Sequence, residues 1–213
     1  MIEKIASNLG RNDEEPNISL AILLSDTRDK EGISEIVQGL KDKKKEVSSD
    51  CIKVLYEIGE RTPELISEYV MDFIGLLESK NNRLVWGGMT ALSQIVYLKH
   101  EEIFNNIEII KKAYKTGSVI TVDNAVSVLA KLCKTNEKYE KTIFDDIINH
   151  LITCRPKEVP QHSERAFICV NKDNSPKFMD VLLKRKESLT EAQKKRVDKL
   201  IKRIELGKYL NHR

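Results

Sequence analysis

The sequence predicts an all-α fold, a right-handed α-α superhelix (solenoid) of about five helix pairs. The main observation is a repeat of 37 residues, seen in two series of apolar positions. The first series is Ile33, Val70, Ile107 and Phe144. The second, half a repeat later, is Leu55, Leu92, Leu129 and Ala166. Each of these positions is followed by further apolar residues at helical spacing, so one repeat contains two amphipathic helices. A single helix pair cannot bury its apolar face alone, so the pairs must stack on one another.

Turn signals separate the expected helices. Asn81-Asn82, Gly117-Ser118 and Arg155-Pro156 mark breaks, and Thr62-Pro63 has the form of a helix start. Thr190 with Gln193 fits a capping box. First-type helices are expected near 31–42, 64–79, 101–115, 138–153 and 176–187. Second-type helices are expected near 45–60, 83–98, 119–134, 159–171 and 191–206.

The repeat predicts a single domain over residues 1–213. Residues 1–30 form an irregular N-terminal pair, 31–174 the regular repeats, and 175–213 a basic C-terminal capping pair. No linker or low-complexity segment interrupts the chain, and no alternating strand pattern argues for a mixed fold.

Charge is concentrated at the C-terminal end. The 213 residues carry a net charge of +3, but residues 176–213 hold 12 Lys/Arg against 5 Asp/Glu. The basic patch is Lys194, Lys195, Arg196, Lys199, Lys202 and Arg203. Their mixed spacings distribute the charge around a helix, which favours a solubilising cap; the alternative is an electrostatic contact with nucleic acid, acidic protein or phospholipid.

The cysteines and histidines predict no metal site and no cofactor. Four cysteines form no C-x-x-C pair, and four scattered histidines show no zinc spacing. No stretch approaches the 18 apolar residues of a membrane span, and the N-terminus lacks a signal-peptide core. We therefore expect a cytoplasmic monomer that does not insert into membranes.

The repeat resembles the HEAT/armadillo-like superfamily over nearly the whole chain. The second-helix faces that carry the resemblance begin at Val54-Leu55, Ala91-Leu92 and Val128-Leu129. The resemblance implies that the second helices line a concave surface. The residues expected there are Lys53, Arg83, Trp86, Thr90, Asp123, Asn124 and Ser127.

Trp86, the only tryptophan, is the expected binding anchor, and packing against a neighbouring helix is the alternative. Gly87 and Gly88 follow it directly. Gly88 aligns with the small residues Cys51 and Ala125, which indicates close approach of the paired helices; the alternative is that Gly87, on the outer side, clears space beside Trp86 for a ligand.

The predicted function is a non-catalytic scaffold or adaptor that binds a protein or peptide on the concave face. Mixed charge on that face suits a protein better than a nucleic-acid backbone. Nucleic-acid binding through the basic C-terminal end is the alternative. A HEAT-like DNA glycosylase is the enzyme alternative, but a second tryptophan and a strongly basic groove are missing.

Overall fold

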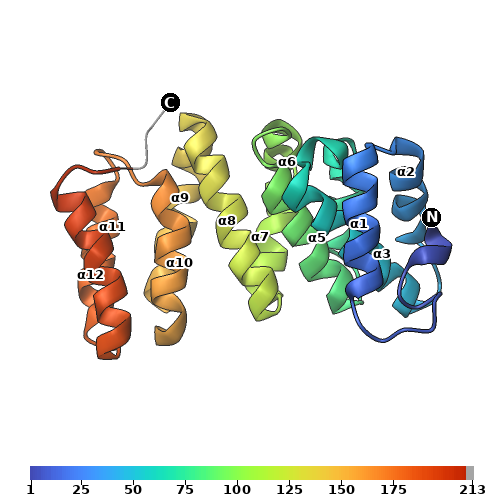
Figure 1. Ribbon diagram of the computed structural model, residues 1–213. Coiled ribbons are helices and arrows are strands. Elements are labelled where there is room, and N and C mark those ends of the chain that lie inside the picture. Colours follow the sequence, from blue (N-terminus) through green and yellow to red (C-terminus); the bar gives the residue numbers. More distant parts are fainter. Residues whose placement is uncertain (210–213) are drawn as a thin grey trace. The chain divides into compact units, whose positions relative to one another are not determined.

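The computed structural model describes residues 1–209, and every regular element in that range is a helix (Figure 1). The chain divides into two compact units, Met1–Ala125 and Val126–Arg213. The single domain predicted over 1–213 stays a prediction. No helix in the described part of the chain has the length and apolar character needed to cross a membrane.

The first unit is built around one long helix, α3 (Lys45–Arg61), which packs against α1, α2 and α5. A 3-10 turn, η1, precedes α1. The helices of this unit are η1 (Ile2–Lys4), α1 (Glu15–Thr27), α2 (Lys30–Gly39), α3, η2 (Pro63–Leu65), η3 (Ser67–Tyr69), α4 (Val70–Leu76), α5 (Asn82–Ile95), α6 (His100–Asn105) and α7 (Ile107–Thr116). Helix α8 (Val119–Thr135) begins here and continues into the second unit.

The second unit repeats the helix-pair arrangement. Its further elements are α9 (Glu137–Thr153), η4 (Pro156–Glu158), α10 (Val159–Ala166), η5 (Phe167–Cys169), α11 (Ser175–Lys186) and α12 (Glu191–Glu205). Helix α11 packs against α9 and α12, and α10 packs against α9 and α12. Thr190 and Gln193 form the predicted capping box at the start of α12.

The 37-residue repeat corresponds to equivalent buried positions. Leu55 on α3, Leu92 on α5 and Leu129 on α8 are all fully buried. Each lies on a second-type helix, as the apolar spacing predicts. The predicted all-α fold of stacked HEAT-like helix pairs is therefore confirmed.

Three expected helices are broken or shortened. The segment 64–79 opens with two 3-10 turns before α4. The segment 101–115 breaks at Asn106, whose side-chain amide donates to the Glu102 carbonyl oxygen at 2.9 Å and competes with the backbone ladder. The segment 159–171 leaves α-geometry after Ala166 and ends as η5. Thr62 does not cap, since its hydroxyl bonds back to the Ile58 carbonyl oxygen.

Gly87 sets the distance between α3 and α5, which corrects the prediction that it clears space for a ligand. It is buried, and a Cβ added there would lie 2.6 Å from Cγ1 of Ile52 on α3. Gly88 faces α4, where an added Cβ would lie 3.0 Å from the Phe73 carbonyl oxygen. Both glycines are thus packing positions, one for each neighbouring helix.

Gly87→Ala is expected to destabilise the protein by about 1–3 kcal/mol, because overpacking against Ile52 outweighs the gain of about 1 kcal/mol in helix propensity. Gly75→Ala is the matched control: Gly75 lies in α4 with open space around it, so alanine should stabilise the protein by about 0.5–1 kcal/mol. Urea unfolding measures both. Equal effects of the two substitutions would contradict the packing role.

Candidate functional site

Three of the predicted binding residues, Lys53, Arg83 and Trp86, lie in one aromatic and ionic group, here called the Trp86 cluster. Glu14 and Tyr56 complete the cluster. Three elements supply it. Glu14 immediately precedes α1 and makes no side-chain capping bond, α3 carries Lys53 and Tyr56, and α5 carries the other two. Asn81 fixes the start of α5 by accepting the Arg83 backbone N–H at 3.0 Å.

Trp86 is half-buried and packs against Tyr56, with ring centroids 5.6 Å apart at an interplanar angle of 45°. The Arg83 guanidinium lies 4.8 Å from the Trp86 ring centroid, at cation–π distance. The tryptophan is therefore held in place by packing and still presents part of its ring. Packing of Trp86 against a neighbouring helix is thus observed, and its role as a binding anchor stays a prediction.

Lys53 is the buried charge of the cluster, with 8% of its side chain exposed. Its ammonium lies 2.7 Å from the Glu57 carboxylate, 3.0 Å from Glu14 and 5.0 Å from the Tyr56 ring centroid. Burial alone would lower the pKa of Lys53, but the hydrogen bonds to Glu57 and Glu14 raise it, so the ammonium stays charged.

Glu14 links the two cations of the cluster. One of its oxygens pairs with Arg83 and the other with Lys53. The Arg83 hydrogen bond, more than the opposing effect of burial, lowers the pKa of the Glu14 carboxyl, with a further contribution from Lys53. With Glu57, the cluster holds two cations and two carboxylates, so it carries no net charge.

The remaining predicted site residues lie on α5 and α8. Thr90 donates to the Trp86 carbonyl oxygen at 2.8 Å and accepts from the Asn124 side-chain amide at 2.9 Å. Asp123 is half-buried at the start of α8. Ser127 belongs to the second unit, where its hydroxyl accepts a hydrogen bond from Arg165 at 2.7 Å.

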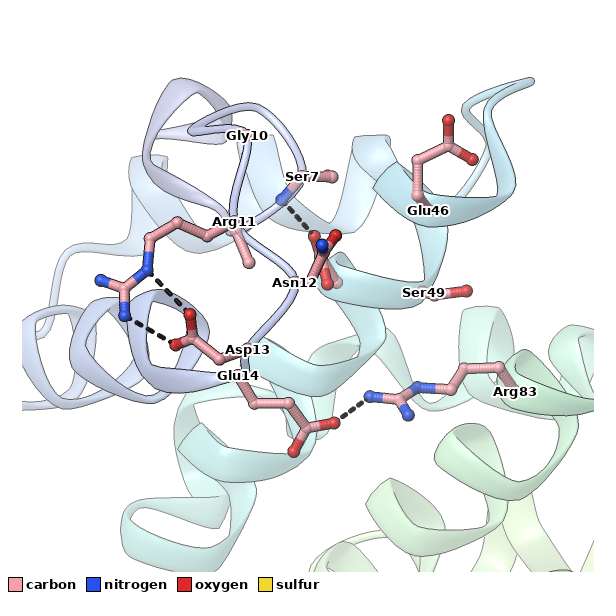
Figure 2. Close-up of a pocket in the computed structure, with 11 residues that line it drawn as sticks. Ser7, Gly10, Arg11, Asn12, Asp13, Glu14, Glu46, Ser49 and Arg83 are labelled. Atoms are coloured by element: carbon pink, nitrogen blue, oxygen red, sulfur yellow. Dashed lines mark hydrogen bonds and ion pairs between the residues drawn. The ribbon is translucent and has the colours of Figure 1, made fainter.

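A surface pocket of about 450 Å³ adjoins the cluster (Figure 2). Its lining includes two arginines and four carboxylates: Arg11, Arg83, Asp13, Glu14, Glu46 and Asp50. Figure 2 shows Arg11 turned onto Asp13 and Glu14 turned toward Arg83. Asp50 accepts from the Ser7 backbone N–H and the Asn17 side chain, both at 2.8 Å. Glu46 is exposed on the first turn of α3, so the pocket is acidic overall.

Three of the six residues of the basic patch on α12 are engaged in contacts within the chain. Lys194 pairs with Glu191, Arg196 makes two hydrogen bonds to Glu164, and Arg203 lies over the Phe167 ring. The other three residues, Lys195, Lys199 and Lys202, are exposed and make no ion pair within residues 1–209. Their spacing places them on one side of α12.

The structure also brings together three side chains of the kinds that bind metal ions, which were not predicted to form a site. His150 on α9, Cys154 at its C-cap and His162 on α10 place their ligand atoms within 4.8 Å of one another. The spacing H-x3-C-x7-H is the signal in the sequence, but it differs from the usual Cys/His spacings of zinc sites.

Glu14→Gln is expected to lower stability at neutral pH, and the difference from wild type should shrink as pH falls below the ordinary carboxyl pKa of 4.5. A carboxyl with a lowered pKa stabilises the fold above its unfolded pKa, near the ordinary value of 4.5, and loses that contribution as pH falls through the folded pKa. Urea unfolding across this pH range measures the difference.

Glu60→Gln is the control, because Glu60 is exposed on α3 and makes no ion pair in the described chain. A difference between wild type and Glu14→Gln that stays constant with pH would show that the Glu14 pairs do not stabilise the folded state.

Comparison with known proteins places this geometry in a family. The family described as sister chromatid cohesion protein PDS5 matches residues 19–199. No protein with a curated description matches the sequence at a significant level.

Several solved structures with the same fold are engineered proteins. One engineered protein shares 19% identity over 99% of both chains, with a TM-score of 0.68. A computationally designed armadillo repeat protein for modular peptide recognition shares 14% identity over 88% of this chain and 91% of its own, with a TM-score of 0.62. Another designed armadillo repeat protein, in complex with the peptide (KR)4, shares 14% sequence identity over the same fractions of the two chains, with a TM-score of 0.63.

At these identities the structures establish the HEAT/armadillo-like fold, and the match over residues 19–199 establishes more: the chain belongs to the sister chromatid cohesion protein PDS5 family.

Proposed function

We propose that this protein is a non-catalytic scaffold that binds a segment of another protein at the Trp86 cluster and the adjoining acidic pocket. The observation that carries the proposal is the single tryptophan, held between Tyr56 and Arg83 and still partly exposed. A partly exposed tryptophan held by its neighbours is the kind of residue that dominates protein interfaces.

The chemistry of the surface favours a partner with both an apolar and a basic side chain. Glu46 and the acidic pocket suit a lysine or arginine, whereas the Trp86 ring suits an apolar neighbour. The cations of the cluster are neutralised by Glu14 and Glu57, so they do not repel such a segment. Peptide binding by designed armadillo repeats supports the use of this fold as a peptide-binding scaffold.

The family description points to the process that supplies the partner. Because the family is named for sister chromatid cohesion, we propose that the bound segment belongs to a protein of that process. A role in cohesion requires access to chromosomes, whereas the sequence analysis expects a cytoplasmic protein.

The test is a selection of displayed peptides on the full-length protein, followed by affinity measurement. Trp86→Ala is expected to weaken binding of the selected peptides by about 2 kcal/mol, or about 30-fold. In the wild type, peptide binding should shift the tryptophan emission. The emission comes from one residue, because the chain has one tryptophan.

Leu98→Ala is the matched control, since Leu98 is half-exposed just beyond α5. Circular dichroism confirms that each variant is folded. If the peptides bind the Trp86→Ala variant as tightly as the wild type, and do not change the tryptophan emission of the wild type, the binding surface lies elsewhere.

The three exposed lysines of α12 favour a second candidate, a weak polyanion contact at the C-terminal end. With about three phosphates neutralised, DNA or RNA affinity should fall by a factor of about 40 between about 50 and 200 mM salt. Lys195→Glu, Lys199→Glu and Lys202→Glu together should remove it. A complex that withstands the higher salt and is lost in this triple variant would make nucleic acid the main partner.

A further inference from the structure

The strongest unassigned feature is the group of His150, Cys154 and His162 in the second unit, here called the His150 cluster. His150 and Cys154 lie one helical turn apart at the end of α9, and His162 faces them from α10. His162 and Cys154 are buried, and His150 is half-buried. The cluster joins the two helices of one hairpin.

The contact between the two histidines resembles a ligand pair. His150 Nε2 and His162 Nδ1 are 2.8 Å apart, so a single proton lies between two ring nitrogens. A metal ion at that position would use both lone pairs. Zinc–nitrogen bonds of about 2.0–2.1 Å in tetrahedral geometry place two nitrogens about 3.3 Å apart, which requires the rings to separate by only about half an ångström.

The sulfur of Cys154 completes the donor set. All three ligand atoms lie within 4.8 Å of one another, and a tetrahedral zinc site needs nitrogen–sulfur distances of about 3.6 Å. Two imidazoles and a thiolate suit a borderline ion such as Zn²⁺, and they do not suit Mg²⁺ or Ca²⁺. Three protein donors leave a fourth position for water or another ligand.

The backbone that carries the cluster is already fixed. The Cys154 N–H donates to the His150 carbonyl oxygen at 2.7 Å, and Arg185 of α11 donates to the Cys154 carbonyl oxygen at 2.6 Å. Next to it, Arg155 and Glu158 close the turn into α10 through a charged pair. The turn that carries Cys154 is thus held by hydrogen bonds on both sides, as a preformed site requires.

We propose that His150, Cys154 and His162 bind one Zn²⁺ ion that fastens α9 to α10 within the second unit. On binding, sulfur–metal and nitrogen–metal bonds form, the thiol proton is released to solvent, and the proton shared by the two imidazoles moves to the other nitrogen of its own ring; no electron is transferred. The inference is independent of the proposed peptide surface, which lies in the first unit.

The test is a cobalt titration of the full-length protein after treatment with a chelator. Co²⁺ is the probe, because thiolate-bound cobalt gives a near-ultraviolet charge-transfer band and tetrahedral cobalt gives intense visible bands. We expect saturation at one equivalent, displacement by Zn²⁺ but not by Mg²⁺, and a rise in melting temperature on adding Zn²⁺.

Cys154→Ser should abolish the charge-transfer band, and His150→Gln should weaken binding by about tenfold or more, since even outer partners of metal ligands contribute 10–100-fold. Cys169→Ser and His100→Gln are the controls and should bind as wild type. Circular dichroism must show each variant folded; His162 is left unchanged because it is fully buried.

Two results would overturn the site: a folded wild type that shows no band with excess Co²⁺, or a band that survives Cys154→Ser. In either case the histidines form only a hydrogen-bonded contact between the two helices.

Discussion

The close approach of α3 and α5 is the constraint on which the first unit depends. Gly87 has no side chain, so Ile52 of α3 can lie against the α5 backbone. The same approach brings Tyr56 and Trp86 to ring contact. A larger residue at Gly87 would separate the helices and, with them, the two aromatic rings. Gly87 thus determines both the distance between α3 and α5 and the ring contact in the candidate site.

Burial of Lys53 follows from that packing and determines the electrostatics of the site. A charge placed so far from water is stable only when paired, and removing one partner leaves an uncompensated ion. Glu57 on the same helix and Glu14 from the start of α1 supply the partners. Because Glu14 also pairs with Arg83, the segment before α1 is tied to α5, 69 residues away. The cluster is therefore a fixed, neutral surface.

The apolar repeat was enough to predict the helices and the buried leucines, because burial repeats with the same period as the sequence. The position of Trp86 on the polar side of its helix also followed from spacing. Contacts between distant parts of the chain could not be predicted this way: nothing near Glu14 indicates that it reaches Arg83. The break at Asn106 was missed because a side-chain hydrogen bond, not the apolar pattern, decides it.

Departures from the repeat mark the positions where this protein differs from a plain stack of helices. Trp86 stands where Ser49 and Asp123 stand one repeat away, so at this repeat position only α5 carries an aromatic residue. His162 occupies the position of Gly88 and Ala125, where the repeat keeps a small residue. A fully buried imidazole in such a position requires a partner for its ring nitrogen, and His150 of the neighbouring helix provides one. Since packing alone would be satisfied by alanine at that position, the histidine is better explained by what its nitrogen binds than by the volume it fills.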